Sequence, residues 1–405
     1  RSFRHGEDTE GTYYGGAHLQ ERICGEIMMT REEMWFGLCS CQGIYRTDIE
    51  RILKTVEDIS NLYGKNKNRF LSELAEGSKR TNGQSVISHE QAEELRKRTG
   101  IDEIRRLMEL NEKRGIRFLS RETPDYPKRL LILKDAPYGI YVKGAVPSEK
   151  PTCGMVGARA CSAYGRSMSE KFAAVLARGN VQIISGMALG IDAICSRSAL
   201  SAGGKTFVVL GGGVDVIYPK ENTDLYYEIL MKGGGILSEY PPGTPSLAWQ
   251  FPHRNRLIAA LSDLLLVMEA RKQSGTLSTV GYALDMGKDV YALPGRVTDP
   301  LSESCNLLIR EGAGMLTTPE EVLSLLTGNQ NGKAAEDQRE QQVQKTGGSD
   351  PEIDKLYEAL DWDAKSLEEI AQKAQIKAER AAFLITFFVL EGLAKEVSPG
   401  YYVKT

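Results

Sequence analysis

The chain has few of the residues that build metal or redox sites. It holds four histidines and seven cysteines in 405 residues, and no two cysteines form a CxxC pair. No histidines stand at zinc-ligand spacing either, so neither a zinc site nor a disulfide framework is indicated. Unpaired thiols in a reducing cytoplasm are the simpler interpretation. We therefore expect no metal, no cofactor and a cytoplasmic location.

Long apolar runs and a large net charge are also missing. No stretch approaches the ~18 consecutive apolar residues that span a bilayer, and the N-terminus lacks the apolar region of a signal peptide. With a net charge of −3, any attraction to an anionic partner depends on local groups of Lys and Arg. Residues 1–28 are polar and poorly patterned, which we interpret as a disordered or non-native extension, with the true start at Met28 or Met29.

Residues 29–120 predict a small helical domain of the SAM or helix-hairpin-helix kind. Apolar residues recur at helical spacing in "REEMWFGLCS", "DIERILKTVEDISNLY" and "DEIRRLMELNEKRGI". The stretch "QGIYRTDIERIL" is similar to a helix-hairpin-helix, whose glycine turn offers backbone N–H groups to a phosphate. Tyr45 stands where the second glycine would be. Contact with DNA and simple helix packing both stay open for this segment.

Residues 121–327 alternate short apolar runs with helical patterns. The candidate strands are "CGMVG", "VQIIS", "TFVVLGG", "GGILSEY", "DLLLVMEA" and "DVYALPG". Apolar strands separated by helices indicate a mostly parallel sheet covered on both faces. We predict an α/β fold with a doubly wound, extended Rossmann-like sheet, in which ligands bind at the carboxyl ends of the strands.

The C-terminal part predicts a linker and a separate module. Residues 328–350 are polar, rich in Gln and Gly and without hydrophobic periodicity, as is typical of a linker. Residues 351–405 read as three helices and a hairpin, which favours a winged-helix domain. This module carries ten acidic and seven basic residues. Because a DNA-gripping helix should be basic, we favour a protein-interaction or regulatory role over DNA binding here.

Glycine, hydroxyl and basic residues gather directly after the predicted strands. Arg159 and Arg166 flank the start of a helix, where unpaired N–H groups and the helix dipole favour an anion. The loop "SGMALGID" repeats this arrangement after the next strand. The predicted phosphate-binding residues are Gly157, Arg159, Ser185, Gly186, Gly190, Lys220, Phe251, Arg254, Asn255, Arg256, Ser274, Gly275 and Thr276. Together they predict an anion-binding crevice with several phosphate-sized subsites.

Each of these motifs also has a simpler explanation. The glycines of a single loop could serve only tight turns and helix-to-sheet packing, but several such loops at one sheet edge favour a site. We expect four polar residues to hold loops rather than to perform acid–base chemistry: Asp192, Asp215, Asn222 and Glu239. His253 is interpreted as a neighbour of the arginines rather than a catalytic base.

Two familiar nucleotide motifs are absent. There is no GxxxxGK[ST] loop and no GxGxxG fingerprint after the first strand of the predicted sheet, which argues against a P-loop ATPase and a dehydrogenase. A cradle without an evident nucleophile, base or metal favours binding over catalysis.

At this point the chain resembles the bacterial DNA-processing protein A family, DprA or Smf. The resemblance rests on "MVGARACSAYG", "SGMALGID", "LGGGVDVIYPKEN", "SEYPPGTP", "FPHRNRLIAALSD" and "LPG" in this order. It implies a non-enzymatic, Rossmann-like protein that binds and protects single-stranded DNA and helps to load the RecA recombinase, notably in natural transformation. By match of motif, Arg159, Lys220, Arg254 and Arg256 would contact DNA phosphates. Phe251 could stack on bases, and a homodimer is expected.

An enzyme acting on nucleoside monophosphates is the alternative. The "SGT" loop looks similar to that of cytokinin-activating phosphoribohydrolases, which carry a PGGxGTxxE motif with a catalytic glutamate. Aligning on "SGT" puts Thr279 where that glutamate would be, and the preceding proline and glycine are missing. The missing carboxylate favours binding.

Overall fold

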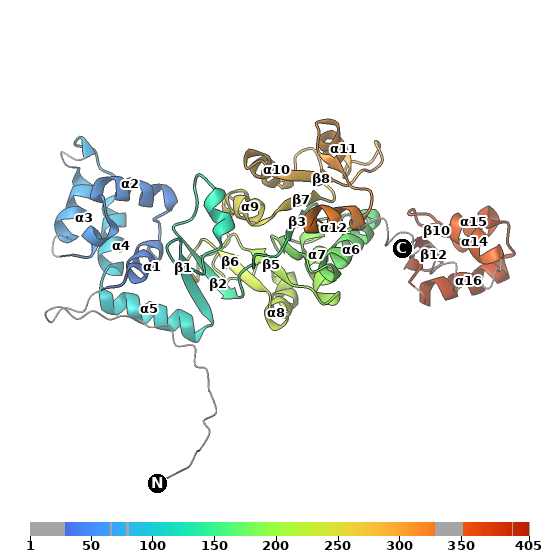
Figure 1. Cartoon of the computed structure of the whole chain (residues 1–405), viewed down its shortest axis with the longest axis horizontal. Coiled ribbons are helices and arrows are strands. Elements are labelled where there is room, and N and C mark those ends of the chain that lie inside the picture. Colours follow the sequence, from blue (N-terminus) through green and yellow to red (C-terminus); the bar gives the residue numbers. More distant parts are fainter. Residues whose placement is uncertain (1–28, 65–66, 78–80, 329–350, 391, 405) are drawn as a thin grey trace, which may run out of the picture.

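The computed structural model describes residues 29–64, 67–77, 81–328, 351–390 and 392–404. The predicted extension at 1–28 and, apart from Gly328, the predicted linker at 328–350 lie outside these ranges. Figure 1 shows helices at one end, a large sheet in the middle and a small C-terminal unit at the other end. Among the described residues, no helix combines the length and hydropathy needed to cross a bilayer.

The N-terminal end is built from five helices. They are α1 (Arg31–Cys39), α2 (Arg46–Val56), α3 (Lys67–Glu76), α4 (His89–Arg98) and α5 (Ile101–Lys113). The side chains of Thr30 and Ser88 accept hydrogen bonds from the backbone of Glu33 and Gln91, which makes capping boxes at the starts of α1 and α4. The helical patterns of the sequence therefore form helices, although the SAM or helix-hairpin-helix label stays a prediction.

A single apolar core joins these helices to the sheet. Phe36 of α1 packs edge-on against the rings of Phe118 and Tyr141, at centroid distances of 5.4 and 6.2 Å. The same cluster of buried side chains reaches Val208 and Ile236 in the middle of the sheet. The helical end is thus continuous with the sheet rather than tethered beside it.

The central sheet has nine strands in the order β1-β2-β6-β5-β4-β3-β7-β8-β9. The strands are β1 (Ile116–Ser120), β2 (Gly139–Gly144), β3 (Thr152–Val156), β4 (Gln182–Ser185), β5 (Thr206–Val209), β6 (Gly235–Ser238), β7 (Leu264–Val267), β8 (Asp289–Ala292) and β9 (Gly314–Met315). From β6 to β9 all neighbours are parallel, whereas β1 and β2 add an antiparallel edge. The predicted α/β fold with a mostly parallel, Rossmann-like sheet is confirmed.

One strand differs from the expectation for residues 29–120. Gly115 takes a positive φ of 69° and ends the helical run after α5. The chain then turns back as β1, in which Ile116 and Phe118 are buried and Arg117 between them is exposed. This short alternation, pairing with β2, belongs to the sheet and not to the helices.

Helices cover both faces of the sheet. One face carries α6 (Ala163–Arg178), α7 (Ile191–Ser201), α8 (Thr223–Met231) and α12 (Pro319–Thr327), and the other carries α9 (Gln250–Leu261), α10 (Thr276–Asp285) and α11 (Glu303–Arg310). Successive strand residues point to opposite faces: Met155 joins the α6 and α7 side, and Val156 joins the α9 side. Burial on both faces explains the continuous apolar runs of the sequence.

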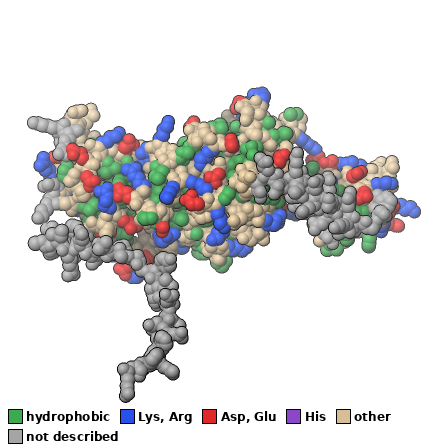
Figure 2. Space-filling view, in the orientation of Figure 1, with side chains coloured by type: hydrophobic (Ala, Val, Ile, Leu, Met, Phe, Trp, Pro, Cys, Tyr) green, Lys and Arg blue, Asp and Glu red, His purple; other side chains and the backbone are tan. Residues whose placement is uncertain are grey.

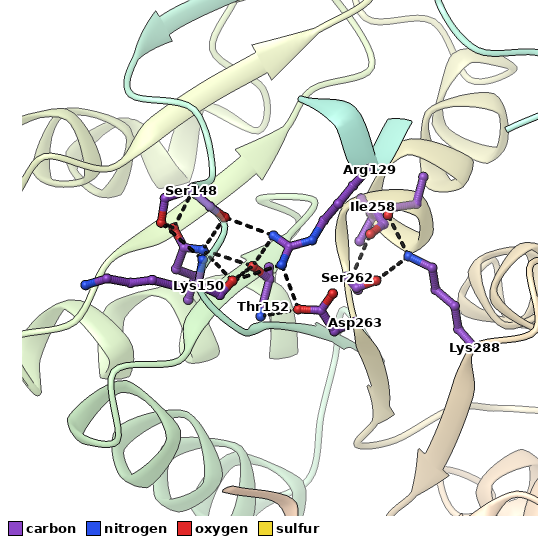
Figure 3. A network of polar contacts seen from close by, with 10 residues as sticks. Arg129, Ser148, Lys150, Thr152, Ile258, Ser262, Asp263 and Lys288 are labelled. Atoms are coloured by element: carbon purple, nitrogen blue, oxygen red, sulfur yellow. Dashed lines mark hydrogen bonds and ion pairs between the residues drawn. The ribbon is translucent and has the colours of Figure 1, made fainter. Parts of the chain in front are cut away.

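A polar network holds the amino-terminal end of the sheet (Figure 3). Arg129 donates to Oγ1 of Thr152 at 3.0 Å and to a carboxylate oxygen of Asp263 at 2.9 Å, just where β3 and β7 begin. Lys288 donates to the carbonyl of Ala260 at 2.6 Å, and burial lowers its pKa to about 8. These side chains hold the amino-terminal ends of β3 and β7. The loops that carry the predicted site residues lie at the opposite, carboxyl ends of the strands.

The C-terminal unit has its own core. It comprises α14 (Pro351–Ala359), β10 (Lys365–Ser366), α15 (Leu367–Ala374), α16 (Ala378–Leu390), β11 (Ala394–Ser398) and β12 (Tyr401–Lys404). The three strands form an antiparallel sheet in the order β10-β12-β11. Lys171 of α6 lies 6.0 Å from the ring centroid of Trp362, and Arg296 pairs with Asp363. The elements are those expected of a winged helix, and that name stays a prediction.

We predict that Gly190→Ala destabilises the chain more than Gly203→Ala. Both glycines have positive φ, 72° and 81°, which costs a non-glycine residue about 1–2 kcal/mol. A Cβ at position 190 would also lie 2.3 Å from the carbonyl oxygen of Ala158, whereas nothing lies within 4 Å at position 203. Urea unfolding should show a further loss of about 2 kcal/mol for Gly190→Ala. Equal losses of unfolding free energy in the two variants would show that the loop of Gly190 can move away from Ala158 without a cost in stability.

Candidate functional site

Four loops meet at the carboxyl ends of the parallel strands. They follow β3, β4, β5 and β7, which are adjacent in the sheet. Going from β3, the chain winds one way through β4, β5 and β6, and then crosses back to place β7 on the other side of β3. In such sheets the crevice at this reversal is the usual place for a ligand. The predicted phosphate-binding residues lie at the end of β4, on these loops, in the first two turns of α9 and at the start of α10, and the predicted support Glu239 follows β6.

The "SGMALGID" loop is held by its own side chains. Ser185 is fully buried, and its hydroxyl donates to the carbonyl of Met155 at 2.7 Å. The carboxylate of Asp192 accepts the N–H groups of Gly186 at 3.1 Å and Ala188 at 3.3 Å. This is the geometry of a loop-holding carboxylate. The predicted role of Ser185 as a phosphate donor does not match its burial, because its proton already serves a strand of the sheet.

The guanidinium of Arg254 lies beneath the same loop. Arg254 is only 5% exposed and donates to the carbonyl of Gly186 at 2.8 Å and to that of Val209. Burial lowers the pKa of Arg254 to about 10, and burial also raises the pKa of the nearby Asp192 carboxyl. A Cβ at Gly186 would come within 2.7 Å of the guanidinium, which explains the glycine there. The structure therefore places Arg254 as a support for two loops rather than as an open phosphate contact.

Arg256 is committed to carboxylates inside the molecule. It is 1% exposed, and it bonds Glu239 at 2.5 Å and Asp135 at 3.1 Å. Within the described residues its Nη1 atom has no hydrogen-bond partner. The prediction that Arg256 contacts DNA phosphate does not fit this position, since the side chain points inward from α9 to an ion pair. Glu239 holds Arg256 rather than the loop alone.

The start of α6 already has an anion. Glu269, 1% exposed at the end of β7, accepts hydrogen bonds from the N–H of Ser162 at 2.9 Å and from its hydroxyl. Gly165 lies so close that a Cβ would be 2.2 Å from this carboxylate. The helix dipole that was expected to attract a ligand anion is thus met by the chain's own Glu269. Sequence reasoning missed this residue, whose only signal is an acid at the end of an apolar strand.

A group of cationic and aromatic side chains, three of them exposed and Phe251 half-buried, lies at the surface of this edge. It consists of Arg159, Tyr218, Lys220 and Phe251, and we name it the aromatic–basic patch. The rings of Tyr218 and Phe251 lie 5.5 Å apart with planes at 33°, and Arg159 lies 5.8 Å from the Phe251 centroid. Tyr218 is 47% exposed, and Arg159 and Lys220 are exposed as well. Gly157 lies under this surface, against Ile191.

A second group lies where α9 meets α10. Asn255 donates to the carbonyl of Gly275 at 3.3 Å and to the hydroxyl of Ser278 at 2.9 Å. Ser274 donates to Oγ1 of Thr276 at 3.0 Å, and its hydroxyl oxygen accepts the N–H of Thr276, the first residue of α10, at 3.2 Å. The predicted "SGT" residues are therefore together beside α9, with Thr276 mostly buried and Gly275 exposed.

The remaining predicted supports join neighbouring loops. Asp215 accepts the N–H of Gly243 at 2.7 Å, which connects the loops after β5 and β6. Asn222 donates to the carbonyls of Met187 at 3.0 Å and Ala188 at 3.2 Å. These contacts tie the loop bearing Lys220 to the loop after β4. The loop that bears Lys220 is thus held by polar contacts to backbone.

The candidate site has no cluster of metal-binding side chains beside it in the described part of the chain. No group of three or more His, Cys, Asp or Glu side chains gathers there in a ligand arrangement. Figure 2 shows Lys and Arg interspersed with Asp and Glu on the face in view, rather than gathered in one broad basic surface. Attraction to an anion at this edge is therefore local.

Fold and edge together define a Rossmann-like α/β protein whose strand ends present an aromatic and cationic surface. The model of the family described as DNA recombination-mediator protein A matches residues 117–327. The chain belongs to this family.

Known relatives agree with this assignment. The chain is 41% identical over 202 residues to protein Smf of Escherichia coli, covering 50% of this chain and 54% of Smf. It is 42% identical over 200 residues to the DNA processing protein DprA of Streptococcus pneumoniae, covering 49% of this chain and 70% of that protein. The X-ray structure of the S. pneumoniae protein matches with a TM-score of 0.59 and 30% identity, covering 73% of this chain and 98% of the other. The matched part spans about half the length of Smf.

We expect Arg256→Met to lower the free energy of unfolding by about 3–5 kcal/mol, because it leaves two carboxylates without their buried partner. Arg114→Met is the control, since Arg114 is about half exposed and lies 3.7 Å from Asp215. Its loss should stay within ~1 kcal/mol. Urea unfolding measures both values. A loss for Arg256→Met as small as that of the control would mean that this ion pair is not needed.

Proposed function

We propose that this chain is a non-enzymatic recombination mediator that binds single-stranded DNA at the aromatic–basic patch. The observation that carries the proposal is that exposed Arg159 lies near the ring of Phe251, which neighbours the ring of Tyr218, while exposed Lys220 follows Tyr218 by two residues. Membership of the recombination-mediator family supports the same substrate.

The chemistry of the patch suits a single strand. Cationic side chains attract the phosphates, and the exposed ring of Tyr218 and the half-buried ring of Phe251 offer surfaces on which unpaired bases stack. Bases of a duplex are already stacked on one another, so they are not available to Tyr218 and Phe251. The rings also work without hydrogen-bond readout, so we expect little sequence preference. Gly186, Gly190 and Arg254 would then contribute by fixing the loops rather than by touching the strand.

The phosphoribohydrolase alternative has less support. Thr279, which stands where the catalytic glutamate of those enzymes would be, is 1% exposed within α10. The buried carboxylate nearest in the chain, Glu269, is engaged by Ser162. Release of free base from nucleoside monophosphates by the purified chain would favour the enzyme over the binder.

The other parts of the chain have proposed roles of their own. We take 29–120 as a helical SAM-like or helix-hairpin-helix-like domain, 121–327 as the DNA-binding domain and 351–405 as a winged helix. Gln91 donates to the carbonyl of Gly43 at 2.8 Å, which supports helix packing at the turn similar to a helix-hairpin-helix. Phe383, Phe387 and Leu390 are exposed along α16, which supports a protein-interaction role for the C-terminal unit.

RecA and a second copy of the chain are the proposed protein partners. A mediator should shorten the lag of DNA-dependent ATP hydrolysis by RecA on single strands coated with single-strand-binding protein. Sedimentation measures the proposed homodimer. If the lag is unchanged while the chain still binds DNA, the chain binds single-stranded DNA but does not load RecA.

We expect Arg159→Ala and Lys220→Ala each to weaken binding of a dT oligonucleotide and to lower the salt slope of log affinity by about 1. Each exposed cation that meets a phosphate releases counterions, which sets that slope. Lys113→Ala is the control, because Lys113 is exposed on α5 and pairs with Glu109 at 2.6 Å, away from the patch. Fluorescence anisotropy across a salt series measures the slopes. If the salt slopes of both patch variants equal the wild-type slope, the DNA does not bind at the patch.

Phe251→Leu should lower the affinity for dT oligonucleotides by ~1–3 kcal/mol, since a stacking surface is lost. Its salt slope should stay at the wild-type value, because no cation is removed. Tyr227→Leu serves as the control, as Tyr227 is an exposed ring on α8. Titrations at a fixed salt concentration give the affinities, and similar losses in the two variants would argue against stacking at Phe251.

A further inference from the structure

A pocket lies on the other side of the first turn of α9. Its volume is about 530 Å³, and it opens between the turn before α2 and the loop that joins β6 to α9. Tyr45 and Arg46 line it from the helical end, and Tyr240, Trp249 and His253 line it from the sheet. A volume of this size is within the range that holds small ligands. None of the predicted phosphate-binding residues lines this pocket.

Aromatic rings form its walls. Trp249 meets Tyr45 edge-on at a centroid distance of 5.4 Å and Tyr240 edge-on at 6.1 Å. Trp249 is 49% exposed and Tyr45 is 45% exposed. Exposed large rings grouped around a hollow are typical of a recognition surface. A planar apolar group would fit against them.

Charges around the pocket balance. Arg46 lies 3.9 Å from Asp135, and Arg256 behind the wall bonds both Asp135 and Glu239. Burial lowers the pKa of His253 to about 4, so this ring is neutral at pH 7. Arg46 also pairs with Glu50 at 3.1 Å, so both cations already have anionic partners. A phosphate gains little here, whereas a neutral group is not repelled.

Tyr240 offers a directed hydrogen-bond donor. Arg256 Nε can only donate, so at 3.4 Å it makes Nε2 of His253 the acceptor and leaves the ring proton on Nδ1. That Nδ1–H then donates to the hydroxyl oxygen of Tyr240 at 3.2 Å. With Nδ1 of His253 as the donor in this contact, the phenol proton of Tyr240 stays available to an acceptor in the pocket, and burial raises the pKa of Tyr240 and keeps the proton in place.

We propose that this pocket takes an unstacked nucleobase of the strand whose phosphates lie on the aromatic–basic patch. The inference rests on the proposed function. Trp249 and His253 face the pocket, while Phe251 between them belongs to the patch, so a strand crossing the first turn of α9 meets both. Stacking against Trp249 and donation by Tyr240 to a base carbonyl match the chemistry of a base, whereas the paired charges around the pocket favour a phosphate little.

The test compares two oligonucleotides of equal length, one of dT and one of abasic residues, on the full chain. Both carry the same phosphates, so the ratio of their affinities reports the bases. Trp249→Leu should lower this ratio roughly tenfold and leave the affinity for the abasic strand unchanged. Tyr240→Phe should lower the ratio less, in the same direction. Trp362→Leu, on the C-terminal unit, is the matched control and should change neither affinity.

The outcomes separate the two proposals. If the wild-type chain binds neither oligonucleotide, the proposed function fails. If it binds both and Trp249→Leu leaves the ratio unchanged, the pocket holds something else, such as an aromatic side chain of a protein partner, and the inference is overturned. Equal losses for both oligonucleotides would also overturn it, because a merely structural role gives that result. Phe251→Leu combined with Trp249→Leu should multiply the two effects, since the rings serve different bases.

Discussion

The carboxyl-terminal edge of the sheet depends on the buried guanidinium of Arg254, which lies between the ends of two strands. It donates to the carbonyls of Gly186 and Val209, after β4 and at the end of β5, and the carboxylate of Asp192 lies close enough to oppose its desolvation. One side chain from α9 thus fixes the spacing of two loops. The exposed residues of the patch take their positions from loops that this charge holds in place.

The sequence contained the fold but only part of the site. Continuous apolar runs between helical patterns are sufficient to predict strands buried on both faces, and the glycines after them mark the loops correctly. What the sequence could not reveal is the direction of each polar side chain. Arg254 and Arg256 point into the molecule, while Phe251 reaches the surface, and that choice depends on the rotation of α9 against the sheet.

Competition from the chain's own groups explains the other differences. The start of a helix attracts anions, and at the start of α6 this position is occupied by the carboxylate of Glu269. Likewise, Ser185 finds the carbonyl of Met155. Both partners are distant in sequence, by 107 and 30 residues, so no local pattern shows them. The loop-holding role of Asp192 could be predicted because its partners, Gly186 and Ala188, lie in the same loop of the sequence.

The shared core of the N-terminal helices and the sheet has a consequence for how the chain can be divided. Composition suggests a boundary near residue 120, but Phe36, Phe118 and Tyr141 pack together across it. Cutting the chain near residue 120 would expose the apolar side chains of this core, and both pieces would present a large apolar face to water. We therefore expect the N-terminal helices and the sheet to unfold as one cooperative unit, whereas the C-terminal unit has a core of its own.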